Sequence, residues 1–276
     1  MGKFDGILLC SDIDGTLLTK DGLPEENIKA IKYFQENGGR FTLCTGRLFD
    51  FLDKYSHLVL PNAPFIAMNG TMIVDKSSGK TLYSCPLELD PGKATAETLT
   101  ELPYLSAAYV FPGGHSTMVR RTEDGFFEIR CGEEMVPAKD PDELNKLLGY
   151  PEKEVYKIVF RVDTEHSDKG KADLSQRFSD FSVFRSWING IEVQSPLADK
   201  GKSARRLADI LGDVKLLVCA GDYENDLSMI EEADIGYAVA NAHSSIIAAA
   251  DRVTKRTCRE GAIAEIIEDL DKEFEN

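Results

Sequence analysis

The amino-acid sequence predicts an α/β fold that is built around a parallel sheet and interrupted by an inserted α+β domain. Near the N-terminus a strand, a helix and a second strand follow one another through Thr45, an order typical of parallel sheets. The same alternation returns after Lys200, whereas the section that begins near Cys85 mixes helices with paired strands. We therefore expect residues 1–84 and 190–276 to form the core and residues 85–189 to form the insertion.

The first strand–helix–strand unit has clear boundaries in the sequence. The apolar run at residues 7–10 predicts a strand, and the helix that follows has Pro24 near its start and Gly38 at its end. Two glutamates follow Pro24, where the positive end of the helix dipole favours acidic side chains. The run at residues 40–44 predicts the second parallel strand. Short strands are expected at 64–68, 71–74 and 80–84, the last two as a hairpin.

Later elements are predicted from the same patterns. From about Cys85 we expect a helix, then strands at 107–111, 117–121 and 155–162 and helices near 141–148 and 169–178. Paired strands are expected at 181–185 and 190–194, on either side of the expected end of the insertion. After Lys200 we expect a helix at 203–211, a strand at 215–220, a helix through Ile230 and a strand at 235–240. A short helix from Ser244 and an amphipathic helix from Gly261 complete the chain.

Composition restricts the class of protein. A chain of 276 residues with 42% hydrophobic and 29% charged residues is typical of a globular protein of two domains. A net charge of −15 argues against nucleic acid or an anionic membrane as a partner, because both require a basic surface. No apolar stretch is long enough to span a bilayer, and the start of the chain does not resemble a signal peptide.

The six cysteines indicate a reducing compartment. They form no Cys-x-x-Cys pair, and Cys10, Cys44 and Cys219 lie in apolar strands, where free cysteine behaves as a small hydrophobic residue. We therefore expect a cytoplasmic protein.

The candidate chemistry begins at the end of the first strand, with Asp12-Ile13-Asp14-Gly15-Thr16. Residues i and i+2 of an extended segment point the same way, so Asp12 and Asp14 would both project past the carboxyl edge of the sheet, where ligands of open α/β sheets bind. Two carboxylates at this distance repel each other unless a cation lies between them or one of them holds a proton, and oxygen ligands favour a hard ion such as Mg²⁺. Gly15 permits a sharp turn after them.

Two further strands deliver polar residues at the same edge. The second strand ends at Thr45-Gly46-Arg47, and the strand at 215–220 ends at a run that contains Asp222, Asn225 and Asp226. Lys200 lies just ahead of a predicted helix. Acids, a hydroxyl group and a lysine in one pocket indicate a phosphate site with a metal ion.

Simpler interpretations exist for several of these residues. Lys202 lies close to Lys200 and could take its place, and Asn225 fits an ordinary helix cap. Arg47 fits a structural or salt-bridging role better than a chemical one. Asn69, followed by a glycine, fits a tight turn at least as well as a ligand.

The ordered set of motifs resembles the haloacid dehalogenase superfamily, and within it the Cof-type phosphatases with a large C2-type cap. The resemblance rests on the Asp-x-Asp-Gly-Thr motif at residues 12–16, Thr45-Gly46-Arg47, Asn69-Gly70, Lys200-Gly201, Gly221-Asp222 with Asn225-Asp226, and Ala238-Val239-Ala240-Asn241-Ala242. It implies a Rossmann-like three-layer core, with residues 85–189 as a cap that decides substrate specificity. One departure is Cys258, in a segment where many relatives carry an asparagine.

The resemblance also implies a role for each site residue. Asp12 would be the nucleophile that forms an aspartyl-phosphate, and Asp14 the general acid and base. Mg²⁺ would be held by Asp12, Asp14 through its main-chain carbonyl, and Asp222, while Asp226 would orient the ligands and Lys200. The phosphate-binding residues would be Ile13, Thr45, Gly46, Lys200 and Asn225.

The sequence thus predicts a Mg²⁺-dependent phosphatase that hydrolyses small phosphorylated metabolites, such as sugar phosphates or phosphorylated cofactors. A phosphotransferase or phosphomutase of the phosphomannomutase-like type is one alternative, since it forms the same intermediate. A non-catalytic regulator that binds a phosphometabolite is another. We expect a small-molecule phosphate ester as the partner, no nucleic acid, no membrane, and a monomer or a weak homodimer.

Overall fold

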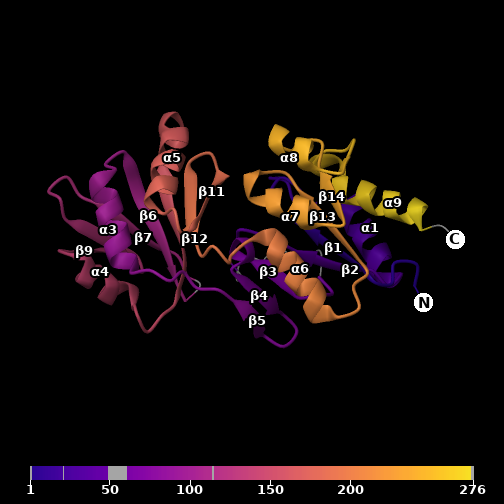
Figure 1. Ribbon diagram of the computed structural model, residues 1–276, viewed down its shortest axis with the longest axis horizontal. Coiled ribbons are helices and arrows are strands. Elements are labelled where there is room, and N and C mark those ends of the chain that lie inside the picture. Colours follow the sequence, from indigo (N-terminus) through magenta and orange to yellow (C-terminus); the bar gives the residue numbers. More distant parts are fainter. Residues whose placement is uncertain (1, 21, 49–60, 114, 275–276) are drawn as a thin grey trace. The chain divides into compact units, whose positions relative to one another are not determined.

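A computed structural model describes residues 2–20, 22–48, 61–113 and 115–274. It divides into two compact units, one made of Met1–Ser84 with Ala198–Asn276 and one made of Cys85–Leu197 (Figure 1). The insertion therefore ends at Leu197 and the chain re-enters the core unit at Ala198, so the predicted boundary at residue 190 is wrong. The reason is that Gly190–Gln194 (β12) pairs antiparallel with Val155–Val162 (β10) and Ser182–Trp187 (β11), inside the sheet of the insertion.

The core unit contains a five-stranded sheet in the order β15-β14-β13-β1-β2, and all of its pairs are parallel. The strands are Ile7–Ser11 (β1), Arg40–Leu43 (β2), Leu216–Gly221 (β13), Ile235–Ala238 (β14) and Arg252–Val253 (β15). Cys10 in β1 lies opposite Cys219 in β13 and Thr42 in β2. The expected parallel α/β core is confirmed.

Helices cover both faces of this sheet. On one face, Lys200–Leu211 (α6) and Leu227–Glu232 (α7) pack on alternate strand residues, so that Leu207 and Met229 join Leu8 and Leu217 in one buried cluster. Glu25–Glu36 (α1) and Ala262–Glu273 (α9) pack against each other and form the other layer (Figure 1). Burial of each large aliphatic side chain stabilises such a core by about 2 kcal/mol.

The ends of α1 and α6 follow from their sequences. Pro24 precedes α1, two glutamates occupy its first turn, and Gly38 follows its end with a φ of 92°. Asp199 precedes α6, and its side chain accepts a hydrogen bond from the N–H of Lys202. Lys200 is thus the first residue of α6, three residues earlier than the predicted helix begins.

A small antiparallel sheet continues the core unit after β2. It contains Phe65–Ala67 (β3), Met72–Asp75 (β4) and Lys80–Ser84 (β5), with the 3-10 turn Met68–Gly70 (η1) between the first two. A bridge between Cys44 and Ile66 places β3 beside the end of β2. Met68, Asn69 and Gly70 all have positive φ values, of 52°, 55° and 91°. Such consecutive left-handed residues are uncommon and often mark functional sites.

The insertion is an antiparallel sheet of seven strands in the order β11-β12-β10-β6-β7-β8-β9. The remaining strands are Leu105–Pro112 (β6), Thr117–Arg121 (β7), Phe127–Cys131 (β8) and Glu134–Ala138 (β9). The helices Pro91–Glu101 (α3), Pro141–Leu148 (α4) and Ser167–Arg177 (α5) share one hydrophobic core with one face of the sheet. The sequence analysis did not predict β8 and β9, although Phe127 and Ile129 alternate with polar residues as in a half-buried strand.

The shorter elements complete the description. They are the 3-10 turns Thr164–His166 (η2), Glu224–Asp226 (η3) and Cys258–Glu260 (η4) and the helix Ser244–Ala249 (α8). Over the ranges that the structure describes, no helix is both long and apolar enough to cross a membrane.

Candidate active site

The predicted site residues come together at the carboxyl edge of the core sheet. Asp12 directly follows β1, and Asp222 directly follows β13. Thr45 follows β2 after one residue. Because neighbouring parallel strands end at the same edge, the three chain segments converge although they lie up to 210 residues apart.

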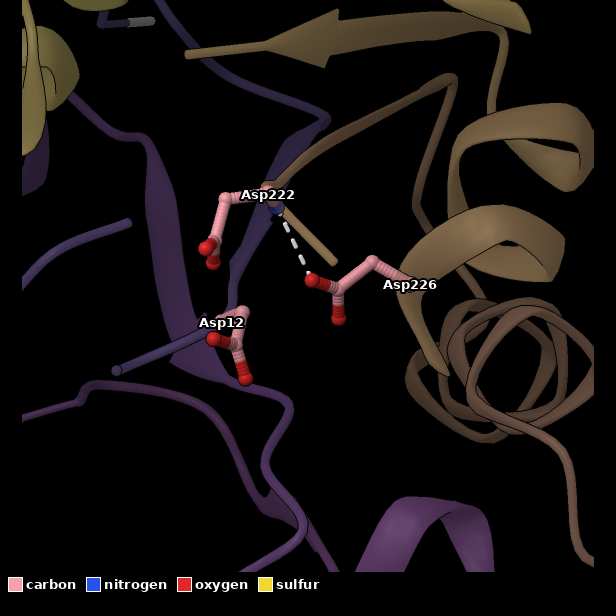
Figure 2. Close-up of side chains that lie close together, drawn as sticks. All are labelled: Asp12, Asp222 and Asp226. Carbon is pink, nitrogen blue, oxygen red and sulfur yellow. Dashed lines mark hydrogen bonds between the residues drawn. The ribbon is translucent and has the colours of Figure 1, made fainter. Parts of the chain in front are cut away.

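Three carboxylates form the centre of the site. One oxygen each of Asp12, Asp222 and Asp226 lies within 4.8 Å of the others, and Figure 2 shows the three side chains directed toward a common space. Burial and then the charge of Asp226 raise the pKa of Asp12 to about 7. Burial and then the charge of Asp12 raise the pKa of Asp222 to about 8. The cluster therefore carries more negative charge than its own surroundings neutralise.

Lys200 provides the positive charge inside this cluster. Its Nζ lies 2.7 Å from Oδ1 of Asp12 and 2.5 Å from Oδ1 of Asp226, and its side chain is fully buried. Burial by itself lowers the pKa of Lys200, but the charges of Asp12 and Asp226 outweigh this effect and raise it. The side chain of Lys202 is exposed, so the structure places Lys200 in the site and not Lys202.

Asp226 uses both of its carboxylate oxygens within the protein. Oδ1 accepts the hydrogen bond from Lys200, and Oδ2 accepts the main-chain N–H groups of Asp222 and Tyr223 at 2.9 and 3.1 Å. Asp12 and Asp222 each keep one carboxylate oxygen without a hydrogen-bond donor among the described residues. Asp226 is therefore suited to orient Lys200 and Asp222, while Asp12 and Asp222 are suited to hold a cation.

The donor set fits a divalent cation such as Mg²⁺. Carboxylate and carbonyl oxygens are the ligands that hard cations prefer, and a bound cation would favour the ionised forms of Asp12 and Asp222, whose pKa values are raised by burial and then by the neighbouring carboxylates. Asp12, Asp222 and the main-chain carbonyl of Asp14 are the groups that would hold the ion.

Gly15 and Thr16 support Asp222 from the first motif. Thr16 donates a hydrogen bond from its hydroxyl to Oδ1 of Asp222 at 2.8 Å. Gly15 has a φ of 87°, and a Cβ atom there would overlap the carboxylate of Asp222. Only glycine therefore fits at position 15, directly after Asp14 and against the carboxylate of Asp222.

Asp14 lies apart from the acid cluster. Its carboxylate accepts hydrogen bonds from Nε and Nη2 of Arg47, and its side chain is half exposed. From the sequence we expected a structural or salt-bridging role for Arg47, and the structure contains a salt bridge. The sequence did not predict that the partner would be the candidate general acid.

The loops after β2 and β3 form the remaining wall. Thr45 is buried, and its main-chain carbonyl accepts the N–H of Asn69 at 2.9 Å. Oδ1 of Asn69 accepts a hydrogen bond from Nδ2 of Asn225 at 3.0 Å. Asn69 therefore joins two of the predicted phosphate-binding residues, Thr45 and Asn225, and Gly46 lies against its side chain.

Ile13 is buried between the two motif aspartates. Its carbonyl accepts the N–H groups of Leu17 and Leu18, whereas its own N–H has no hydrogen-bond partner in the described part of the chain. This free donor is compatible with the predicted contact between Ile13 and phosphate.

The sequence analysis assigned no role to Asn241, which the structure connects to the site. Its Nδ2 donates to the carbonyl of Gly15 at 2.8 Å, and its Oδ1 accepts the N–H of Cys258 at 2.7 Å. Asn241 thus ties the turn after Asp14 to the segment at Cys258 that departs from the family pattern. Its place in the quoted Ala-Val-Ala-Asn-Ala segment was the available signal.

The fold places an acid cluster with a buried lysine at the carboxyl edge of a parallel sheet, an arrangement that suits a hydrolase of the α/β class. The sequence pattern of the haloacid dehalogenase-like hydrolases matches residues 9–267, so the chain belongs to that family. Membership confirms the family and the enzyme class that the sequence predicts, a phosphatase of the haloacid dehalogenase type.

Individual relatives match over most of their length. The 5-amino-6-(5-phospho-D-ribitylamino)uracil phosphatase YwtE of Bacillus subtilis is 28% identical in an alignment that covers 94% of this chain and 96% of YwtE. The pyridoxal phosphate phosphatase YbhA of Escherichia coli is 25% identical and covers 89% of this chain and 92% of its own length. The solved structure of the subclass IIB sugar phosphatase BT4131 shares the fold, with a TM-score of 0.73 at 20% identity over 96% of this chain and 98% of that one.

Proposed function

We propose that the chain is a Mg²⁺-dependent phosphatase that hydrolyses small phosphorylated metabolites through an aspartyl-phosphate on Asp12. The observation that carries this proposal is the buried contact between Nζ of Lys200 and Oδ1 of Asp12. A lysine at that position can fix the orientation of the nucleophile and neutralise charge on the phosphoryl group. Asp226 holds Lys200 from the other side.

In the first half of the reaction, a carboxylate oxygen of Asp12 attacks phosphorus. The new bond joins this oxygen to phosphorus, the bond between phosphorus and the alcohol oxygen breaks, and Asp14 donates its proton to that oxygen. In the second half, Asp14 takes a proton from water and the water oxygen bonds to phosphorus. The bond between phosphorus and the Asp12 oxygen breaks, which leaves Asp12 as a free carboxylate and releases inorganic phosphate. Bound Mg²⁺ would supply neutralisation of negative charge on the phosphoryl oxygens.

Thr45, Gly46, Asn225 and the N–H of Ile13 would hold the phosphoryl oxygens. Their support comes from the hydrogen bonds that link Thr45 through Asn69 to Asn225. Positioning of this kind supplies much of the catalysis in phosphoryl transfer.

The insertion would contact the leaving group and decide which metabolite is accepted. Alternate residues of β10 and β12 point into the hydrophobic core between the insertion's sheet and its helices. Lys157 of β10 and Glu192 of β12 therefore lie on the opposite face of that sheet, where Ser186 of β11 bonds Glu192. The activities for which YwtE, YbhA and BT4131 are named support sugar phosphates and phosphorylated cofactors as the substrate class.

A screen of sugar phosphates and phosphorylated cofactors, with Mg²⁺ and with EDTA, tests the proposal. Release of free phosphate that depends on Mg²⁺ is the expected result, and Asp12→Asn should abolish it. Asp209→Asn is the matched control, because Asp209 is exposed on α6. Transfer of phosphate to an added sugar at a rate far above hydrolysis would favour the phosphomutase alternative, and binding without turnover would favour the regulator.

We further propose a cytoplasmic enzyme that acts as a monomer or a weak homodimer without nucleic acid or membrane. The buried thiols Cys10, Cys44 and Cys219 and the net charge of −15 support this setting. Size-exclusion chromatography with light scattering tests the oligomeric state.

A further inference from the structure

We propose that Arg47 is a positioning residue that holds the carboxyl group of Asp14 in the orientation needed for proton transfer to and from the substrate. The inference rests on the proposed function, in which Asp14 is the general acid and base. Arg47 bonds both oxygens of Asp14, Nε to Oδ2 and Nη2 to Oδ1. This two-point contact fixes the plane of the carboxyl group as well as its position.

Arg47 is the sole hydrogen-bond partner of the Asp14 carboxylate in the ranges that the structure describes. The side chain of Asp14 is 51% exposed, so packing holds it only weakly. Without Arg47, rotation about the side-chain bonds of Asp14 would carry the carboxyl group away from the leaving oxygen for part of the time. Proton transfer needs hydrogen-bond reach, so such rotation would slow it.

The main chain of Arg47 is anchored to the candidate phosphate-binding loop. Its N–H donates to Oγ1 of Thr45 at 3.2 Å, and its carbonyl accepts the N–H of Met68 at 3.1 Å. Met68 begins the left-handed turn that also contains Asn69. The position of the acid and base is thereby coupled to the position of the groups that would hold the phosphoryl oxygens.

Fold stability does not account for this pair. Arg47 is 34% exposed and Asp14 is 51% exposed, and ion pairs at such exposure contribute little to stability. A comparable pair exists elsewhere in the core unit, where Nη1 and Nη2 of Arg40 bond the two oxygens of Asp213. Arg40 is the first residue of β2, at the end of the strand opposite Thr45, so it provides a matched control.

The test compares leaving groups that differ in their need for a proton. A sugar alkoxide is strongly basic and must be protonated as it leaves, whereas a nitrophenolate is weakly basic and leaves without a proton. The probes are p-nitrophenyl phosphate and the fastest alkyl ester among glucose 6-phosphate, ribose 5-phosphate and glycerol 3-phosphate. The measured quantity is kcat/KM, which reports only steps up to departure of the leaving group when an aspartyl-phosphate forms.

For Arg47→Met we expect kcat/KM to fall about 10- to 100-fold with the alkyl ester, because a misplaced general acid loses part of its contribution. With the aryl ester the fall should be less than about 3-fold. Arg47→Lys, which keeps the charge but not the two-point geometry, should recover part of the loss. In an Asp14→Asn background, Arg47→Met should have little further effect. Arg40→Met should leave both values unchanged.

Equal losses with both esters would overturn the inference, because Arg47 would then act on phosphate binding or on the fold. An undiminished effect of Arg47→Met in the Asp14→Asn background would also overturn it. Failure of the proposed function gives a different result: Asp14→Asn itself would then show no dependence on the leaving group, or the unaltered chain would hydrolyse none of the probes.

Discussion

The hydroxyl of Thr16 donates a hydrogen bond to Oδ1 of Asp222 at 2.8 Å, across 206 positions of the sequence. Thr16 belongs to the first motif and Asp222 to the last acidic one, so this bond fixes two candidate metal ligands, Asp12 and Asp222, relative to each other. Groups that orient metal ligands commonly contribute strongly to metal affinity.

Thr16→Val should therefore weaken Mg²⁺ binding by about 10-fold, because Asp222 loses the donor that orients it. The measurement is the Mg²⁺ dependence of the melting temperature, together with Mg²⁺ activation of phosphate release. Thr100→Val, on the exposed side of α3, should change neither. Unchanged Mg²⁺ affinity in Thr16→Val would show that the bond does not orient the metal site.

Without divalent ions, the melting temperature should fall as the pH rises from about 4 to about 8. The folded state raises the pKa of Asp12 to about 7 and that of Asp222 to about 8, so it binds more protons than the unfolded chain in this window. Stability contributed by these groups is present below their unfolded pKa values and is lost as the pH passes through the folded ones.

In thermal scans we expect the contribution of Asp12 and Asp222 to lower the melting temperature by at least about 3 °C over this pH range. Asp222→Asn should make the pH dependence shallower, and saturating Mg²⁺ should restore the melting temperature at pH 8 more than at pH 5. A metal-free protein whose melting temperature rises steadily to pH 8, with no effect of Asp222→Asn, would contradict the prediction.

Lys200→Met should lower kcat/KM about 1,000-fold or more, since it removes the buried charge beside Asp12, the proposed nucleophile. It should also destabilise the metal-free protein more at pH 8 than at pH 5, because Asp12 and Asp226 then face each other without a cation. Lys202→Met, two positions away on the exposed side of α6, is the control for both measurements. Equal behaviour of the two variants would remove Lys200 from the site.

The insertion contains a buried ion pair whose loss should be costly. Nζ of Lys157 lies 3.0 Å from Oε2 of Glu192, and both side chains are less than 5% exposed. Glu192→Leu should destabilise the insertion by about 3 kcal/mol or more, because the buried ammonium group of Lys157 loses the carboxylate that compensates its charge. The double variant Lys157→Met/Glu192→Leu should recover most of that loss.

Urea unfolding followed by a probe in the insertion measures these differences. Glu128→Leu, which breaks the exposed pair with Arg120 on the same sheet, should cost less than about 1 kcal/mol. If the double variant were as unstable as Glu192→Leu, shape and packing rather than charge would explain the loss.

Local patterns in the sequence were sufficient for most of the core. The apolar run before Asp12 is enough to predict β1, and Pro24 and Gly38 mark the two ends of α1. The apolar run before Asp222 predicts β13 in the same way. The convergence of Asp12, Lys200 and Asp222 also followed, because the carboxyl ends of parallel strands share an edge.

Contacts between distant side chains could not be predicted in the same way. Arg47 lies 33 positions from Asp14, and nothing in either neighbourhood distinguishes that carboxylate from the many others. The same holds for Asn69 and Asn225, 156 positions apart. The end of the insertion was misplaced because β12 is assigned to it by pairing with β10 and β11, and pairing partners are not marked in the residues of β12 itself.

The chain passes between the two units at two junctions, after Ser84 and after Leu197. The second junction is followed at once by Asp199, which caps α6, and by Lys200. A cassette from a relative could therefore be grafted between positions 84 and 198 while the cap residue and the lysine keep their native sequence context. Because we propose that the insertion decides specificity, two splices would exchange the proposed specificity unit and leave the acid cluster in place.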